Sequence, residues 1–402
     1  MHIIYMGIIS RPEDIGKIGE ASVAGNKMQY NLLKYLCRYE DMQIDVVSFH
    51  PYKAFPHCKK LFIKKTKEQL FDNVDLWQVG YPNLPVIKQL IIPLTTRAMA
   101  KKLIRGKDDV LMAFDMYPNQ GVPMAMLRKK VEDRTVCLLA DLSIGGTVKE
   151  RGLRKILRKF YDQSTLSNMR KCRNYIALNE NAVKTYAPDS DYIIVDGGIE
   201  PSEFAAAPAG WDGKEKNLIY TGALVDYSGI MNLIAAMELI EDKSIVLDIY
   251  GDGALKPEVE WIAAENPRIR YHGRVSNQEA MQAQQSAWLL VNPRPTESHI
   301  AKVTFPSKIF EYLMSGRPVM TTRLNGFSAD YDDLLFWVEG DTPEDLATQI
   351  NSIGRIASEE LTRRARSARE YLLKYKTWEQ NAKRIYQFLV DTLGEKHESA
   401  DK

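Results

Sequence analysis

The sequence predicts an α/β protein built from two doubly wound, Rossmann-like domains. Two runs of alternating strand and helix patterns carry this prediction, one over residues 2–195 and one over residues 217–321. The segment between them, 196–217, is rich in Gly, Pro, Ala and charge, which is typical of a linker. Because 402 residues suffice for two cores of ordinary size, we expect one core in each run.

The first run opens with a short apolar strand at 2–10 and a loop of small residues at 16–25. Apolar residues then recur at helical spacing from Met28 to Leu36, and a second strand follows at 42–49. This order is that of a βαβ unit, which predicts parallel strands. Further strands are predicted at 109–113, 135–140, 174–178 and 192–195, and helices at 120–130, at 148–172 and from Asn179.

The second run repeats the pattern. Strands are predicted at 217–221, 244–250, 269–272, 288–292 and 319–321, and helices at 230–239, 256–265, 277–287, 307–315 and over most of 343–394. Ligands of doubly wound sheets bind beyond the carboxyl ends of the strands. We therefore expect a ligand shared by both domains to lie in a cleft between them.

The bulk composition excludes several classes of protein. With 54 basic and 52 acidic residues the net charge is +2, so no nucleic-acid partner is predicted. Four cysteines are too few for a disulfide scaffold, and the N-terminal apolar run is too short for a signal peptide. The most apolar stretch, 84–100, is broken by prolines and cations and falls short of a membrane span. The expected location is the cytoplasm, with a peripheral position at the inner face of the membrane as an alternative.

The six histidines form no ligand pattern, so neither a metal nor another cofactor is predicted.

The segment Phe305-Pro306-Ser307-Lys308 has the strongest chemical signal. Pro is favoured at the first helical position and Ser caps helix amides. Lys308 in the first turn opposes the helix dipole, and a bound anion removes that conflict. Glu311, one turn further, can accept hydrogen bonds from two adjacent sugar hydroxyls. The alternative is an ordinary capped helix with a solvated Lys and Glu.

Four motifs in order carry a family resemblance: Tyr220-Thr221-Gly222-Ala223, Ile249 to Gly253, Tyr271 to Val275, and FPSKIFEYLMSGRPVM from Phe305. This half resembles the family 4 retaining glycosyltransferases, which have the GT-B fold of two Rossmann-like domains. The resemblance reaches 195–199 and 376–379, whereas the first 190 residues match mainly in architecture. It implies an acceptor-side domain at 1–198, a nucleotide-sugar donor domain at 199–375, and a helix returning to the first domain, with a tail, at 376–402.

The resemblance also implies a donor site. Glu311 matches the second Glu of the family's Glu-x7-Glu motif, which binds the nucleotide ribose, and Phe305, Pro306, Ser307 and Lys308 occupy the stretch whose amides face the diphosphate. The first Glu of that motif contacts the transferred sugar, but here position 303 is Val. Glu297 is the nearest candidate for its role, and a solvated loop carboxylate is the alternative. The chain thus has a variant donor motif, FPSK-x2-E.

Two cations of the family pattern are absent, since Ala223 and Ser228 stand at their places. A leaving nucleoside diphosphate carries about two negative charges, and preorganised positive charge is often the largest catalytic contribution. Lys308 is the expected substitute, ahead of Arg274, Arg294 and Lys302. The rival explanation is that activity is weak or lost.

Other donor contacts follow from the same resemblance. Arg274 and Val275 stand at a strand end where the family's backbone meets the base. Gly222, Gly251 and Gly253 permit close approach of the backbone. In the first domain, the amides of Gly25 and Asn26 are expected to face the diphosphate, although no GxGxxG fingerprint is present. For Arg274 the alternative is a plain strand-to-helix turn with an exposed Arg.

Asp115 and Asp141 each follow a predicted strand of the first domain. Either can orient or deprotonate the acceptor hydroxyl, and helix capping is the alternative for both. No covalent nucleophile is assigned, because front-side attack assisted by the leaving phosphate is the usual proposal for retaining enzymes of this fold.

The basic helix at 148–172 places Leu153, Ile156, Leu157 and Phe160 on one face. Such a helix is typical of a dock on an anionic membrane that presents a lipid-linked acceptor, with Lys59, Lys60, Lys64, Lys65 and Lys67 adding charge. It is also typical of a helix whose apolar face packs in the core, and we favour that second interpretation.

The predicted function is transfer of a sugar from a nucleoside diphosphate sugar to a glycan or lipid-linked glycan acceptor, in surface polysaccharide synthesis. The alternatives are a nucleotide-sugar epimerase of the same fold, or a catalytically weak nucleotide-sugar-binding protein.

Overall fold

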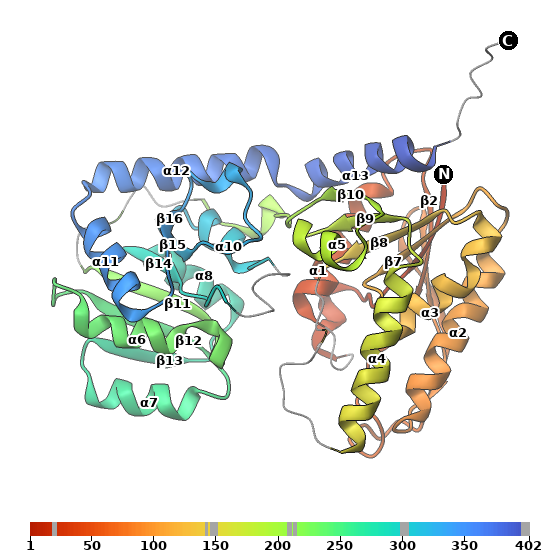
Figure 1. Cartoon of the computed structure of the whole chain (residues 1–402), viewed down its shortest axis with the longest axis horizontal. Coiled ribbons are helices and arrows are strands. Elements are labelled where there is room, and N and C mark those ends of the chain that lie inside the picture. Colours follow the sequence, from red (N-terminus) through yellow and green to blue (C-terminus); the bar gives the residue numbers. More distant parts are fainter. Residues whose placement is uncertain are drawn as a thin grey trace, which may run out of the picture. The chain divides into compact units, whose positions relative to one another are not determined.

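The structure is a computed structural model that describes residues 1–17, 22–140, 144, 152–206, 211, 215–297 and 305–394. The chain forms two compact units, which are Met1–Gly198 with Trp378–Lys402 (unit 1) and Ile199–Thr377 (unit 2). Each unit has its own sheet of mainly parallel strands, with helices packed on it (Figure 1). This confirms the predicted fold class of two Rossmann-like domains.

Unit 1 contains an eight-stranded sheet in the order β10-β9-β8-β7-β1-β2-β5-β4. All neighbouring strands are parallel except β4 and β5, which are antiparallel. The strands are β1 His2–Met6, β2 Gln43–Ser48, β4 Thr66–Phe71, β5 Val74–Gln78, β7 Val110–Phe114, β8 Thr135–Leu139, β9 Asn174–Ala177 and β10 Asp191–Ile194. A separate antiparallel pair is formed by β3 (Phe62–Ile63) and β6 (Tyr81–Pro82).

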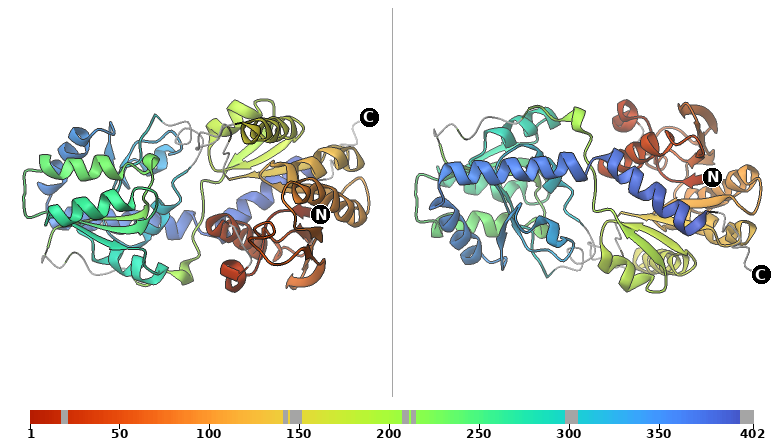
Figure 2. Two further views of the ribbon diagram at one scale, coloured as in Figure 1. Left: turned by 90° about the horizontal axis from the view of Figure 1, so that it is seen from below. Right: turned by 90° about the horizontal axis from the view of Figure 1, so that it is seen from above.

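The helices of unit 1 are α1 Val23–Leu36, α2 Ile87–Leu103, α3 Pro118–Leu127, α4 Leu153–Met169, α5 Glu180–Tyr186 and α13 Trp378–Leu393. Helix α13 packs against α1, although nearly the whole chain separates them in sequence (Figure 2). Its buried side chains Trp378, Ile385 and Leu389 join the core of unit 1. The last helix of the chain is therefore part of the first unit's hydrophobic core.

Several features of unit 1 differ from the sequence interpretation, which assigned no strand to the region of β3, β4, β5 and β6. The stretch 84–100, to which no element was assigned, contains most of α2, with Pro93 buried inside the helix. In α4 the exposed side chains include Ile156, Leu157 and Phe160, so the interpretation that this face packs in the core is wrong. The reason is that α4 is buried through its C-terminal half, where Thr165 and Asn168 are almost inaccessible to solvent. Periodicity alone does not tell which stripe of a helix is covered.

Unit 2 contains a six-stranded, fully parallel sheet in the order β13-β12-β11-β14-β15-β16. The strands are β11 Asn217–Ala223, β12 Val246–Asp252, β13 Ile269–Gly273, β14 Leu289–Asn292, β15 Val319–Thr322 and β16 Phe336–Val338. The helices are α6 Ile230–Leu239, α7 Lys256–Glu265, α8 Asn277–Ser286, α10 Lys308–Met314, α11 Pro343–Gly354 and α12 Ser358–Tyr375.

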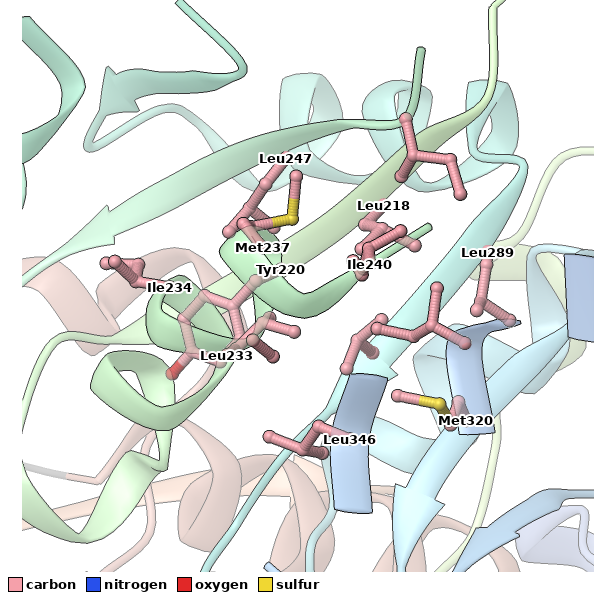
Figure 3. Close-up of a cluster of buried hydrophobic side chains, with 14 of the residues drawn as sticks. Leu218, Tyr220, Leu233, Ile234, Met237, Ile240, Leu247, Leu289, Met320 and Leu346 are labelled. Carbon is pink, nitrogen blue, oxygen red and sulfur yellow. The ribbon is translucent and has the colours of Figure 1, made fainter. Parts of the chain in front are cut away.

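The core of unit 2 lies between this sheet and helices α6 and α11. Leu218, Leu247 and Leu289 from three strands meet Leu233 of α6 and Leu346 of α11 (Figure 3). Burying each such side chain stabilises the fold by about 1.5–3 kcal/mol. Because the core fixes the register of β11, β12 and β14, it also fixes where their carboxyl ends lie.

Within the described residues, none of the helices combines the length and the apolar character needed to cross a bilayer.

Candidate functional site

The carboxyl end of β11 is held from three directions through one residue, Thr221. Its N–H donates to the Tyr312 hydroxyl at 2.9 Å, and its hydroxyl accepts from Gln284 Nε2 at 3.0 Å. Its carbonyl accepts from Lys308 Nζ at 2.6 Å. Burial raises the pKa of Tyr312 to about 12, so its hydroxyl stays protonated over the working pH range. Helices α8 and α10 are thereby fixed to the strand end where a ligand of this fold binds.

Lys308 is half-buried and places its positive charge at the Thr221 carbonyl, the residue before the Gly222-Ala223 turn. Burial lowers the pKa of its ammonium, and the nearby Glu311 carboxylate opposes that shift. An ammonium has three donors, and the Thr221 carbonyl engages one of them. An anion bound at the carboxyl end of β11 would therefore meet the remaining N–H donors and the positive charge of Lys308.

The loops that follow β11 and β12 pack backbone against backbone. A Cβ atom at Gly251 would lie 1.7 Å from the Gly222 carbonyl oxygen, and the φ angle of Gly251 is 150°. The Leu224 amide donates to the Asp252 carbonyl at 3.0 Å. Only glycine fits at Gly251, because any side chain would displace the Gly222 turn.

The two positions that lack the family's cations have structural partners. Ala223 is exposed, and its carbonyl accepts from the Tyr220 hydroxyl at 2.8 Å. Ser228 Oγ accepts from the Ile230 amide at 3.3 Å, at the start of α6. Arg294, which follows β14, lies near enough to Tyr220 to oppose the rise in its pKa that burial causes. Arg294 and Lys308 are therefore the basic side chains that the described residues bring to this strand end.

The side chain of Phe305 lies in an aromatic cluster of unit 2, rather than projecting from the loop. Its ring centroid is 5.4 Å from Phe310 and 5.1 Å from Phe327, with an edge contact to the latter. Pro306 is also buried. These two residues anchor the start of α10, so any contact they make with a donor is through their backbone.

Ser307 departs from the predicted capping role. It precedes α10, but its side chain makes no capping hydrogen bond. Its backbone, with φ −53° and ψ −25°, is already in the helical region, whereas a capping serine needs an extended conformation. The Ser307 side chain is exposed.

The other predicted donor residues lie on loops of unit 2. Glu311 is half-buried on α10, and Glu297 is exposed in the loop after β14. The positions between that loop and α10, including Val303 and Lys302, lie outside the described residues. Arg274 is exposed directly after β13, and Val275, which follows it, is half-buried.

A polar cluster near Arg274 was not predicted. His272 Nε2 lies 2.7 Å from Asp248 Oδ1, and the His272 ring stacks on Tyr250 at 4.3 Å between centroids. Asp248 and Tyr250 alternate along β12 and so share one face of the sheet. The sequence feature that could have indicated this cluster is Asp248, a charged residue inside the otherwise apolar strand β12.

In unit 1, Gly25 and Asn26 open α1 as predicted, but their amides have intramolecular acceptors. The Gly25 amide donates to Ser22 Oγ at 3.1 Å and the Asn26 amide to the Ser22 carbonyl at 2.9 Å. The Asn26 side chain makes two hydrogen bonds to the backbone of Ser10, at 2.8 and 3.0 Å. Asn26 therefore fixes the loop after β1 to α1, and contact with a donor stays a prediction.

Asp115 is almost fully buried and accepts a hydrogen bond from the Ala140 amide at 2.9 Å. Its φ angle of 53° is in the left-handed region, which an Asp tolerates better than most residues. This carboxylate binds the turn after β8. Asp141, the other predicted acceptor-side carboxylate, lies outside the described residues.

Over the part of the chain that the structure describes, no group of three His, Cys, Asp or Glu side chains is arranged to hold a metal ion. All four cysteines are thiols.

Comparisons with known proteins define the class of protein. Residues 215–354 match a sequence-family model described as "Glycosyl transferases group 1". This range contains β11 to α11, including all the elements around Thr221. No curated protein matches the chain in sequence.

Many solved structures share the fold along the whole chain. Sucrose-phosphate synthase from Thermosynechococcus elongatus is 15% identical, with 97% of this chain and 99% of that chain covered and a TM-score of 0.68. Anabaena HepE, solved in complex with UDP, is 14% identical, with 97% and 100% covered and a TM-score of 0.65. The lipopolysaccharide outer core galactosyltransferase WaaB is 13% identical, with 97% and 100% covered and a TM-score of 0.63.

The fold is thus that of the GT-B glycosyltransferases. Together with the family match over 215–354, it confirms the prediction that the chain is an enzyme of the glycosyltransferase class.

Proposed function

We propose that the protein transfers a sugar from a nucleoside diphosphate sugar to a carbohydrate acceptor, with retention at the anomeric carbon. The observation that carries this proposal is the family match over 215–354, the segment in which the carboxyl ends of β11, β12 and β14 converge. The proposal is supported by the glycine turns after β11 and β12 and by Lys308, with Glu311 one turn further, because parallel sheets of this kind bind nucleotides beyond the carboxyl ends of their strands.

The donor diphosphate is proposed to lie over the Gly222-Ala223 turn. Lys308 supplies positive charge there from below, and its position is fixed by the Thr221 carbonyl at 2.6 Å. A charge that is fixed before the reaction stabilises a developing diphosphate without reorganisation, which is where electrostatic catalysis gains most. Glu311, on the same face one turn along, accepts hydrogen bonds from the ribose hydroxyls.

Uridine is the nucleotide that we favour, because the similarly folded HepE was solved with UDP. The acceptor is proposed to be a glycan or lipid-linked glycan of a surface polysaccharide. Support for that setting comes from the similarly folded WaaB, which is a lipopolysaccharide outer core galactosyltransferase.

Retention is proposed to follow a front-side attack in which the leaving phosphate takes the acceptor proton. Asp115 is a poor candidate for the base, because it is buried and hydrogen-bonded to the Ala140 amide. Glu297 and Asp141 keep the roles predicted for them, at the transferred sugar and the acceptor hydroxyl.

The proposal is tested by measuring the thermal stability of the protein with a panel of nucleotide-sugars and nucleoside diphosphates, followed by slow-hydrolysis assays on the hits. We expect UDP and at least one UDP-sugar to raise Tm, and the released sugar to keep its anomeric configuration by NMR. If no member of the panel stabilises the protein, the donor site is wrong.

A second candidate, binding without turnover, is favoured by one observation. Ala223 and Ser228 provide no cation, and Ser228 is engaged with the Ile230 amide. A binding protein would show the Tm shift with UDP-sugars but no hydrolysis or transfer. An epimerase would convert the donor in solution without any acceptor.

A further inference from the structure

Unit 1 exposes a group of large apolar side chains around the β3–β6 pair and the first half of α2. Six of them are exposed to solvent, and the exposed fractions of Phe62 and Leu90 are 60% and 65%. We call this the β3–α2 surface, and its apolar residues are Leu61, Phe62, Val86, Ile87, Leu90 and Leu94. Single exposed apolar residues are ordinary, but a cluster of this size on neighbouring elements marks an interaction site.

Hydrogen bonds hold these elements together as one surface. Phe62 pairs with Pro82 in the two-stranded sheet, and the Asn83 amide donates to the Leu61 carbonyl at 2.8 Å. Lys88 Nζ, in the first turn of α2, donates to the Tyr52 carbonyl at 2.6 Å. The segment before β3 is therefore bound to the start of α2, and the apolar groups are presented by a fixed backbone.

Val86, at the start of α2, has a φ angle of 64°, which is rare and costly for a β-branched residue. Its side chain gains no burial in return, since it is exposed. Strained residues cluster at functional sites, so the conformation of Val86 is consistent with a contact at this position.

The two segments that carry the β3–α2 surface are rich in basic residues, although the neighbouring strands β4 and β5 carry Glu68 and Asp75, the latter paired with Lys67 at 2.8 Å. Residues 46–67 contain six lysines and no acidic residue, and residues 76–107 contain six basic residues and no acidic residue. At the chain's average frequency of 52 acidic residues in 402, the two segments together would hold about seven. Lys59, Lys64 and Lys65, which flank Leu61 and Phe62, are all exposed.

We propose that the β3–α2 surface docks the protein on an anionic lipid bilayer. Exposed aliphatic and aromatic side chains beside exposed lysines match the interface of a membrane that carries negative headgroups. The apolar side chains enter the boundary between headgroups and acyl chains, while the lysines stay at the headgroups. A nucleic acid would not account for the exposed apolar side chains. The proposal does not depend on the donor chemistry of unit 2.

The start of α4 has the same character. Ile156, Leu157 and Phe160 are exposed beside the exposed Lys155 and Lys159. Helix α3 contacts both α2 and α4, so the three helices form one layer of unit 1 (Figure 1). The first half of α4 is a second contact of the same kind on that layer.

The test is co-sedimentation of the full-length protein with vesicles of phosphatidylcholine alone or mixed with phosphatidylglycerol. We expect binding to the anionic vesicles, weaker binding to the neutral ones, and loss of binding as salt is raised. Two variants probe the surface, Phe62→Ser/Leu90→Ser and Lys64→Glu/Lys65→Glu. Each is expected to lower the partition coefficient at least about 10-fold, because the first removes two apolar side chains from the bilayer interface and the second reverses two charges near the anionic headgroups.

Matched controls lie elsewhere on the chain. Trp261→Ser removes an apolar side chain that is 67% exposed on α7, and Lys130→Glu/Lys383→Glu reverses two exposed lysines of unit 1. Both controls should bind vesicles as the unchanged protein does, and all variants should keep its Tm within experimental error.

Three outcomes would overturn the proposal. The first is a protein that stays in solution with anionic vesicles at low salt. The second is binding that the surface variants leave unchanged. The third is a chain that is dimeric by light scattering, becomes monomeric with Phe62→Ser/Leu90→Ser and does not bind vesicles, because the surface would then be covered by a second copy.

Discussion

Lys308 illustrates how one side chain serves both the fold and the proposed chemistry. Its ammonium binds the Thr221 carbonyl, which keeps α10 on the end of β11, and the same bond holds the charge where the proposed diphosphate lies. Burying a cation is costly, and the lowered pKa of Lys308 reflects that cost, which the nearby Glu311 carboxylate offsets only in part. In the proposed complex the donor diphosphate would add a second anion beside this ammonium.

The first prediction concerns the contribution of this charge to donor binding. Lys308→Ala is expected to weaken UDP binding at least about 10-fold, because a charge-assisted hydrogen bond contributes about 1.5–3 kcal/mol. Titration calorimetry with UDP measures the change. Lys308→Met, which keeps the apolar stem, should lose as much affinity as Lys308→Ala. Unchanged affinity in both variants would show that Lys308 does not replace the absent cations.

The second prediction concerns pH. Burial lowers the pKa of Lys308 below its ordinary value of 10.5, and UDP favours the protonated form. The affinity for UDP should therefore be highest below the lowered pKa and fall as pH rises through it. Lys308→Arg, which stays charged at every accessible pH, is the control for titration of the nucleotide itself. A pH profile identical in Lys308→Arg and the unchanged protein would contradict the assignment.

The third prediction concerns Tyr312. Tyr312→Phe removes the acceptor of the buried Thr221 N–H, which should lower the free energy of unfolding by about 1–3 kcal/mol. Tyr271→Phe is a matched control, because the half-exposed Tyr271 hydroxyl donates to the Gly251 carbonyl at 2.8 Å, where water can replace it. Urea denaturation measures both. Equal losses in the two variants would mean that the burial of the Thr221 amide is not what matters.

At the scale of elements, the donor site depends on the contact between the turns after β11 and β12. Gly251→Ala places a Cβ at 1.7 Å from the Gly222 carbonyl oxygen, so one of the two turns must move. We expect a loss of several-fold in UDP affinity and a lower Tm. Gly354→Ala, at the end of α11 with open space around it, should be neutral or stabilising by up to about 1 kcal/mol. Normal UDP binding by Gly251→Ala would show that the turn does not contact the donor.

The helices and strands also show how much of the fold could be predicted from the sequence. In unit 2 each predicted strand is present, because apolar runs bounded by glycine turns alternate with periodic helices. Helix α2 was missed since Pro85 and Pro93 argue locally against a helix, and packing of its buried face outweighs that preference. The exposed face of α4 was misjudged because a single sequence does not reveal which apolar stripe a neighbour covers.

In the candidate site too, some residues were predicted from the sequence, whereas the contacts between distant residues were not. Lys308, Glu311 and the glycine turns were predicted from motifs that are local in sequence. The bond from Lys308 to the Thr221 carbonyl and the stack of His272 on Tyr250 join residues that only the sheet order brings together. Likewise, nothing in the sequence indicated that the Asn26 side chain is occupied by the backbone of Ser10.

At the scale of the whole molecule, each unit has a hydrophobic core of its own, and the core of unit 1 is completed by the last helix of the chain. We therefore expect two cooperative unfolding transitions in a calorimetric scan. UDP binds unit 2 in our proposal, so it should raise only the transition of that unit, by about 2.7 kcal/mol of stabilisation at 100 times its Kd.

The assignment of these transitions is the last prediction. Leu389→Ala in α13 removes a fully buried side chain from the core of unit 1, which should cost about 2–5 kcal/mol and lower only the transition that UDP leaves unchanged. Leu346→Ala in α11 is its counterpart in unit 2 and should lower the transition that UDP raises. If Leu389→Ala lowered the UDP-sensitive transition instead, the C-terminal helix would stabilise the donor unit, and the division of the chain into these two cores would be wrong.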